Sequence, residues 1–184
     1  MNIHETALDG VLLIQPERHR DARGWFQESW QSQRFNAAVG RDVTFVQDNL
    51  SRSNHGVLRG MHLQRNVGQG KLVSVTQGRI YDVAVDARPH SPTFGQHISF
   101  VLDSEAGQQL WLPEGIAHGF LTLSDSAQVH YKVTQFYQPE AELVLRFNDV
   151  TCAIQWPLHE IKSSLIVSEK DQQGLSWAPL CENL

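Results

Sequence analysis

Residues 110–120 of the chain read LWLPEGIAHGF. Two apolar segments flank a turn marked by Pro113 and Gly115, the residue types that most often interrupt regular structure. His118 follows this turn, so it is either a hydrogen-bonded turn residue or part of a site. The pattern predicts two short strands joined by the turn, over 108–112 and 119–123.

Similar segments continue on both sides of this stretch. Apolar or alternating runs separated by glycine or proline predict further strands over 11–14, 58–64, 71–76, 79–85, 97–102 and 128–134. The best helix candidate is 30–39. Short strands with regular turn signals are typical of a sandwich or barrel, and a jelly roll is the form whose open interior can hold a ligand. We therefore expect one mainly β, jelly-roll domain over 1–184 with a few short helices.

The composition is that of a folded globular protein. The chain has 184 residues, is 41% hydrophobic, and carries a formal net charge of -5. A mildly acidic chain lacks the positive field that nucleic-acid binding requires, and no apolar stretch is long enough to cross a bilayer. With two cysteines and no signal-like run after 1–10, we expect a cytoplasmic protein with reduced thiols.

The predicted strand over 58–64 carries polar side chains that share one face. Because side chains alternate along a strand, His62 and Gln64 point the same way, and Lys71 opens the next strand. A histidine and a lysine directed into one cavity are hard to explain as packing, because buried charge is costly. A surface strand with a polar face is an equally good interpretation of this segment alone.

The spacing of Pro113, Gly115 and His118 fits the Pro-x-Gly-x-x-His pattern of the second cupin motif. The first cupin motif supplies His-x-His and then a glutamate as metal ligands. Here the corresponding residues are His-Leu-Gln at 62–64 and Lys71, and a protonated lysine is no ligand and repels a divalent cation. The cupin resemblance therefore favours the fold without a metal site, with His118 as a polar wall or phosphate contact.

Four other segments are ambiguous when taken singly. Tyr131 alternates with apolar neighbours in 128–137, where a tyrosine is usually a core residue with a hydrogen bond. Arginine, glutamine and asparagine beside aromatic residues in 21–28 and 45–49 could bind a base and a phosphate, or simply form a surface. Residues 168–171 read as an ordinary helix-capping or surface segment.

Taken in order, these stretches resemble the dTDP-4-dehydrorhamnose 3,5-epimerase family. The resemblance extends over nearly the whole chain, through 21–28, 47–49, 59–62, 70–73, 82–86, 91–95, 110–120, 131–132 and 168–171. It implies a cupin jelly roll that works as a homodimer without a cofactor. It also implies an isomerase that inverts C3 and C5 of a dTDP-4-keto-6-deoxyglucose-type sugar.

The resemblance also assigns residue roles. His62 matches the general base, Asp171 matches the acid that orients it, Lys71 lies near the keto oxygen, and Tyr131 matches the opposite-face proton donor. Substrate-binding positions match a larger set, of which the first two are expected to reach across the dimer: Arg23, Glu28, Gln47, Asn49, Arg59, His118, Glu142 and Lys170.

The sequence departs from the family pattern at the pocket wall. Leu63 replaces a frequent aromatic residue, Phe136 a frequent tyrosine, and 65–68 lacks the usual proline and is one residue short. These changes bear on sugar or nucleotide preference. The alternatives are a mono-epimerase on a related nucleotide sugar, a metal-dependent cupin oxygenase, and a non-catalytic sugar-binding cupin.

Overall fold

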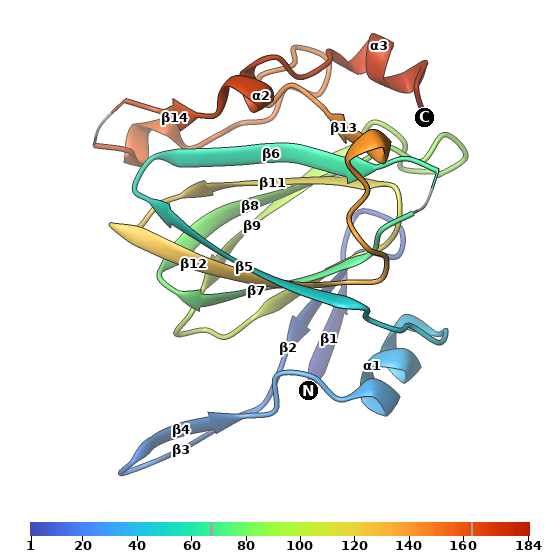
Figure 1. Cartoon of the computed structure of the whole chain (residues 1–184). Helices are drawn as coiled ribbons and strands as arrows, with labels where there is room; N and C mark the ends of the chain where they lie inside the picture. Colours follow the sequence, from blue (N-terminus) through green and yellow to red (C-terminus); the bar gives the residue numbers. More distant parts are fainter. Residues whose placement is uncertain (67, 163) are drawn as a thin grey trace.

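The computed structural model describes residues 1–66, 68–162 and 164–184, so Val67, in the short loop noted above, lies outside the described residues. Two sheets face each other and form a barrel (Figure 1). One sheet, in spatial order, contains β1 (Asn2–Glu5), β2 (Leu12–Gln15), β10 (Gln109–Leu112), β7 (Lys71–Gln77), β12 (Ser126–Val133) and β5 (Gln47–Asn54). The other contains β13 (Glu142–Val144), β6 (Val57–Gln64), β11 (Ile116–Thr122), β8 (Arg79–Asp86) and β9 (His97–Asp103), with β14 (Ile166–Val167) beside β6.

The remaining elements lie outside the barrel. A hairpin of β3 (Arg18–Asp21) and β4 (Gly24–Gln27) projects away from it (Figure 1). The helices are α1 (Ser32–Val39), α2 (Glu169–Gln172) and α3 (Trp177–Cys181), with short 3-10 turns at Pro139–Ala141 and Leu158–Glu160. Within the described residues, no helix has the length and apolar character needed to cross a membrane.

The predicted all-β jelly roll is confirmed, with shifted element ends. The second strand of the 110–120 stretch begins at Ile116 rather than at residue 119, because β11 pairs with β8 along its whole length. The predicted helix begins at Ser32 rather than at residue 30, because the Gln31 side chain caps it by accepting the backbone N–H of Arg34.

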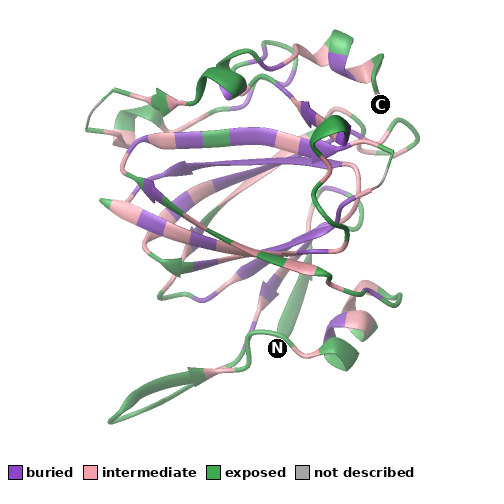
Figure 2. Cartoon of the chain, viewed as in Figure 1, coloured by how far each residue is buried: buried purple, intermediate pink, exposed green. Residues whose placement is uncertain are grey.

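The sheet formed by β6, β11 and β8 is buried on both faces. On β8, Ile80 and Ala84 pack inside the barrel, whereas Val83 and Val85 pack outward against the C-terminal segment. Figure 2 shows buried residues along these strands and an exposed β3–β4 hairpin. The C-terminal segment therefore covers the outside of the sheet that carries several candidate site residues.

Two glycines bring β6 and β11 unusually close. A Cβ atom at Gly60 would lie 2.6 Å from the carbonyl oxygen of His118, and one at Gly119 would lie 2.7 Å from the carbonyl oxygen of Arg59. Gly60 also has a φ of 106°, which side chains with a Cβ rarely adopt. This close approach pairs His62 with His118 in register on adjacent strands.

Candidate active site

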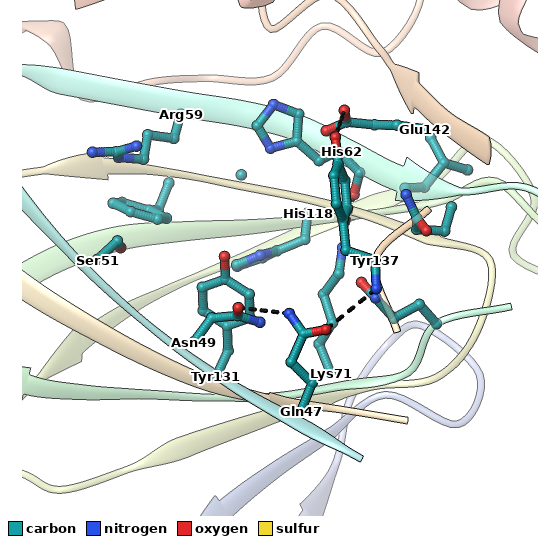
Figure 3. Close-up of a pocket in the computed structure, with 15 residues that line it drawn as sticks. Gln47, Asn49, Ser51, Arg59, His62, Lys71, His118, Tyr131, Tyr137 and Glu142 are labelled. Carbon is teal, nitrogen blue, oxygen red and sulfur yellow. Dashed lines mark hydrogen bonds between the residues drawn. The ribbon is translucent and has the colours of Figure 1, made fainter. Parts of the chain in front are cut away.

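A cavity of about 350 Å³ opens between the two sheets (Figure 3). Its walls come from both sheets, so residues far apart in the sequence meet inside the barrel. The lining residues are Gln47, Asn49, Ser51, Arg59, His62, Leu63, Gln64, Gln69, Lys71, His118, Gly119, Phe120, Tyr131, Tyr137 and Glu142.

His62 lines this cavity from β6 and pairs with a carboxylate behind it. Its Nε2 lies 2.7 Å from Oδ1 of Asp171, and Oδ2 of Asp171 accepts the backbone N–H of Gly60 at 3.1 Å. Burial alone would raise the pKa of Asp171, but these bonds and the proximity of His62 hold it below its usual value. An ionised carboxylate only accepts, so Nε2 carries the proton and Nδ1 is left as the basic nitrogen.

Asp171 owes its position to the short helix α2. Ser168 caps this helix, with its Oγ accepting the backbone N–H of Asp171 at 3.2 Å. The capping segment predicted for 168–171 is therefore confirmed, and it fixes the carboxylate against His62. Lys170, the preceding residue, turns instead to Glu142.

Lys71 lies at the start of β7, only 6% exposed, and donates from Nζ to the carbonyl oxygen of His62 at 2.9 Å. Burial lowers the pKa of Lys71 to about 8, while the negative charges of Glu142 and Asp82 act in the opposite direction. A lysine with such a pKa is cationic at neutral pH, and it can stabilise negative charge that develops in the cavity.

Tyr131 reaches the cavity from β12, in the sheet opposite His62 (Figure 3). Its ring packs against the apolar interior of the barrel, as its alternation with Val129 and Val133 predicted. Burial raises the pKa of Tyr131 above its ordinary value of 10.0, so the hydroxyl keeps its proton at neutral pH. The cavity thus holds a basic nitrogen and a protonated hydroxyl on opposing walls.

His118 also faces the cavity, beside His62. Its Nε2 lies 2.8 Å from Oδ2 of Asp82, which is fully buried on β8. The position predicted as a polar wall is therefore a second histidine–aspartate pair. Among the described residues, no group of three or more His, Cys, Asp or Glu side chains is arranged to hold a metal ion.

One end of the cavity carries a chain of polar contacts. The Tyr137 hydroxyl donates to Oε2 of Glu142 at 2.8 Å, and Lys170 pairs with the same oxygen. Burial would raise the pKa of Glu142, but these two bonds hold it below its usual value. Nearby, Gln47 donates to Asn49 at 2.8 Å and accepts the backbone N–H of Tyr137.

At the other end, Arg59 of β6 is held by the preceding strand, β5, of the opposite sheet. Its Nε donates to Oγ of Ser53 at 2.8 Å, and Nη2 donates to the carbonyl oxygen of Arg52. These contacts leave the rest of the guanidinium group on the cavity wall (Figure 3). It is a cation available to an anionic ligand.

The structure separates two predicted residues from the rest. Arg23 is 90% exposed by side chain on the β3–β4 hairpin and pairs with Asp21, and Glu28 pairs with Arg34 after that hairpin. Neither lines the cavity of its own chain. Asp171 and Lys170 also lie outside the lining, but they contact lining residues directly.

The structure adds several residues for which no role was predicted. Tyr137 and Ser51 are lining residues of this kind, and Gln69 donates to the carbonyl oxygen of Gln135. The most informative addition is Asp82, an acidic residue inside the otherwise apolar run 80–85, a placement that is itself a signal in the sequence.

Comparisons with known proteins agree with this geometry. The family model described as dTDP-4-dehydrorhamnose 3,5-epimerase matches residues 5–178. A curated protein of that name from Methanothermobacter thermautotrophicus is 47% identical over 183 residues, which cover 97% of this chain and 94% of the relative.

Solved structures agree as well. The dTDP-6-deoxy-D-glucose-3,5-epimerase of Legionella pneumophila, solved with dTDP-4-keto-L-rhamnose, is 45% identical with a TM-score of 0.89, covering 94% of this chain and 90% of that one. A 3'-monoepimerase from Streptomyces bikiniensis, solved with dTDP-quinovose, is 31% identical with a TM-score of 0.88, covering 95% of this chain and 87% of that one. The chain belongs to the dTDP-4-dehydrorhamnose 3,5-epimerase family.

Proposed function

We propose that this enzyme inverts C3 and C5 of a dTDP-linked 4-keto-6-deoxyglucose. One observation carries the proposal: His62 and Tyr131 face a common cavity from opposite sheets, and Lys71 lines the same cavity. Both carbons lie next to the C4 ketone, so one set of groups can serve each of them in turn.

The chemistry follows from the acidity of a C–H bond beside a ketone. Nδ1 of His62 removes the proton, and the carboxylate of Asp171 stabilises the resulting imidazolium at Nε2. The electron pair moves to the ketone oxygen, where the ammonium of Lys71 stabilises the enolate. Tyr131 then donates its hydroxyl proton to the carbon from the other side, which inverts the centre and restores the ketone. Proton exchange with solvent then returns a proton to the Tyr131 phenolate and removes one from the His62 imidazolium before the next carbon reacts.

Substrate binding is proposed for the two ends of the cavity. Arg59 presents its guanidinium group to the pyrophosphate and His118 a ring nitrogen to the sugar, and Gln47, Asn49 and Glu142 offer amide and carboxylate groups to the hydroxyls of the sugar. Lys170 supports Glu142 from behind. The Legionella relative was solved with a dTDP-keto sugar, which supports the same ligand class here.

We further propose a homodimer. The β3–β4 hairpin projects from the barrel and leaves Trp25 51% and Phe26 69% exposed (Figure 1). An arm with exposed aromatic residues beside Arg23 is suited to bind a second copy and to bring Arg23 and Glu28 to its cavity. Cys152 and Cys181 are both free thiols, which supports the cytoplasm as the place of action.

The proposed reaction uses no metal or other cofactor. The side chains at the metal-ligand positions of the cupin motif are already engaged with backbone. Gln64 exchanges hydrogen bonds with Gln138, and Lys71 donates to the carbonyl oxygen of His62.

Activity should therefore survive exhaustive chelation with EDTA, followed by assay in metal-depleted buffer. A histidine–carboxylate pair and an ammonium group supply the base and the charge stabilisation that a metal would otherwise provide. Elemental analysis of the purified protein is the companion measurement. Loss of activity on chelation, restored by one added metal ion, would refute this part of the proposal.

The function itself is tested by proton NMR of dTDP-4-keto-6-deoxyglucose with the wild-type enzyme in heavy water. We expect the proton signals at C3 and C5 to disappear and the product couplings to show inversion at both carbons. Exchange and inversion at one carbon alone would identify a mono-epimerase. Exchange at neither carbon would refute the proposed function.

A further inference from the structure

Asp82 carries a carboxylate in the buried interior of the barrel, where a charge is energetically unfavourable. It lies on the inward face of β8 between Ile80 and Ala84, and all three residues are 0% exposed. Its Oδ2 contacts Nε2 of His118, whereas its Oδ1 has no hydrogen-bond partner among the described residues. Packing alone would favour an apolar residue at such a position, since a buried and partly unsatisfied carboxylate destabilises the fold.

Three charged or titratable groups of the cavity lie around this carboxylate. His118 on β11 is bonded to it, and His62 is the in-register neighbour of His118 on β6. Lys71 on β7 donates to the carbonyl oxygen of His62 and is within the influence of the charge of Asp82. The other titratable groups that line the cavity are Arg59, Tyr131, Tyr137 and Glu142. Asp82 and Glu142 are therefore the carboxylates that can oppose the loss of charge at Lys71.

These two carboxylates differ in how far they are already neutralised. Glu142 is paired with the ammonium of Lys170 and accepts the hydroxyl of Tyr137. Among the described residues, the side chain of Asp82 is hydrogen-bonded to the imidazole of His118 alone. The negative charge of Asp82 is consequently the less compensated of the two, and it acts on Lys71 in addition to the larger effect of Glu142.

We propose that Asp82 is a positioning residue of this active site, whose buried charge keeps Lys71 protonated and fixes His118 with its Nε2 proton toward β8. The inference rests on the proposed epimerase function, in which Lys71 stabilises the enolate. With Nε2 committed to Asp82, Nδ1 is the nitrogen of His118 that remains for the substrate. The cavity thus uses two histidine–aspartate pairs: Asp171 supports the base, and Asp82 supports the charge at the ketone oxygen.

The test is Asp82→Asn, which keeps the shape and the hydrogen bond to His118 but removes the charge. Lys71 is titrated directly by NMR of protein carrying lysine labelled with ¹³C at Cε, with Lys71→Met used to assign its signal. The wild-type pKa should be near 8. The pKa of Lys71 should be lower in Asp82→Asn, because one of the two carboxylates that oppose the effect of burial has then lost its charge. An unchanged Lys71 titration in folded Asp82→Asn would overturn the proposal, whether or not the protein is active on the sugar proposed.

The kinetic readout separates this role from a merely structural one. In Asp82→Asn, kcat should fall by about 10- to 100-fold, and deuterium exchange and inversion should slow together, because enolate stabilisation precedes both. The alkaline limb of the kcat profile should move to lower pH, since Lys71 loses its proton earlier. Loss of kcat with an unmoved alkaline limb would contradict the charge role.

Thr122→Val is the matched control. Thr122 is 0% exposed on the neighbouring strand β11, and its hydroxyl likewise has no hydrogen-bond partner among the described residues. The variant removes a buried polar group of similar depth but no charge. It should leave the Lys71 titration and the alkaline limb where they are, and an equal shift in this control would overturn the proposal.

Discussion

At the scale of single residues, the hydrogen bond that a polar side chain forms with the protein determines which of its atoms remains available to the substrate. His62 and His118 are neighbours that both commit Nε2 to an aspartate, which leaves Nδ1 of each ring as the free nitrogen. Lys71 commits one N–H to backbone and otherwise faces a buried cavity. Each of these side chains depends on a neighbouring group for its position or its protonation state. Single substitutions should therefore show what each side chain contributes to activity and, separately, to the free energy of unfolding.

Lys71→Met should abolish activity and yet stabilise the fold at pH 7. The folded pKa of about 8 lies below the ordinary 10.5, so burying the cation costs stability at every pH below 8, and the cost fades between pH 8 and 10.5. The free energy of unfolding should rise by up to about 3 kcal/mol at pH 7, less the lost hydrogen bond to His62. Urea denaturation at pH 7 and pH 10 measures this, and the gain should shrink at the higher pH.

Lys132→Met is the matched control, because Lys132 forms a partly exposed ion pair with Asp48 on β5. It should change stability by less than about 1 kcal/mol. A Lys71→Met protein that is less stable than wild type at pH 7 would show that the lysine is tolerated in the barrel without cost.

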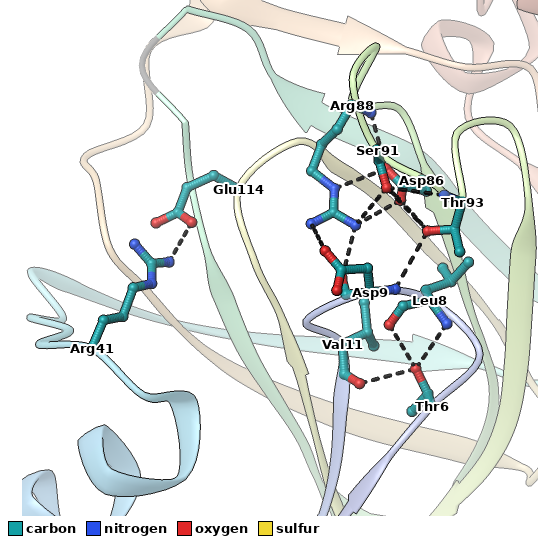
Figure 4. A network of polar contacts seen from close by, with 10 residues as sticks. All are labelled: Thr6, Leu8, Asp9, Val11, Arg41, Asp86, Arg88, Ser91, Thr93 and Glu114. Carbon is teal, nitrogen blue, oxygen red and sulfur yellow. Dashed lines mark hydrogen bonds and ion pairs between the residues drawn. The ribbon is translucent and has the colours of Figure 1, made fainter.

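At the scale of elements, a hydrogen-bond network around Asp86, here called the clasp, lies at the end of β8. The buried carboxylate of Asp86 accepts hydrogen bonds from the side chains of Arg88, Ser91 and Thr93, and Arg88 also donates to the backbone of Asp9 (Figure 4). The clasp therefore joins the β8–β9 loop to the turn between β1 and β2. Burial would raise the pKa of Asp86, but these hydrogen bonds lower it to about 2.

Asp86→Asn should destabilise the protein at neutral pH. Because the folded pKa is depressed, the contribution is fully present above the unfolded value of about 3.9 and is lost as the pH falls toward 2. The expected loss is about 2–3 kcal/mol at pH 7, measured by urea denaturation, and it should shrink toward pH 3.

The control is Asp103→Asn at the end of β9, where the carboxylate accepts a backbone N–H from Glu105 near the surface. It should lower the free energy of unfolding by less than Asp86→Asn does. An equal loss in both variants, or a loss that is independent of pH, would mean that the clasp does not act through the ionised Asp86.

The elements also show what the sequence could and could not predict. Strands with an apolar inner face, such as β7, β8 and β12, follow from alternation. The strand β5 was not predicted, because its inner face is polar, with Asn49 and Ser51 lining the cavity, whereas Leu50 on the outside is 65% exposed. A strand whose inner face lines a ligand site carries polar residues inside, which is the reverse of the usual alternation. The short β13 and β14 depend on pairing with β6, which no local signal encodes.

The site divides in a similar way. Strand alternation left His62 and Lys71 open to a polar surface as well as to a cavity, and it indicated a core position for Tyr131, so the family resemblance was needed to place all three in one active site. The partner of His118 could not be read from spacing, because it requires the register of β11 against β8. Asp171 lies 109 positions beyond His62, so only the family resemblance joined them before the fold did.

At the scale of the whole molecule, hydrogen bonds fix the base of the β3–β4 hairpin, here called the arm, to the barrel. Arg18 donates to the backbone of Ser104 and Glu105 and to the side chain of Gln27, which itself donates to the backbone of Gly107. The tip, with Arg23, stays exposed. The arm is therefore anchored in its own barrel and, in the proposed dimer, completes the cavity of the partner.

Mixed dimers test this sharing. His62→Ala and Arg23→Ala should each be nearly inactive alone, but unfolding and refolding them together should restore about a quarter of wild-type activity, because half the dimers then hold one intact site. Mixing His62→Ala with Tyr131→Phe, whose changes lie in the same cavity, should restore none. No recovery in the first mixture would show that the arm serves its own chain.

In the proposed reaction a base and an acid act from opposite walls of the cavity, and the Tyr131→Phe variant in heavy water separates their roles. Proton NMR measures two rates in one sample: deuterium incorporation beside the ketone, and inversion of the same carbon. His62 can still remove a proton and return a deuteron from its own side, so incorporation should persist. Inversion should fall by about 100- to 10,000-fold, the usual worth of a positioned acid. Inversion at the wild-type rate in this variant would rule out Tyr131 as the acid.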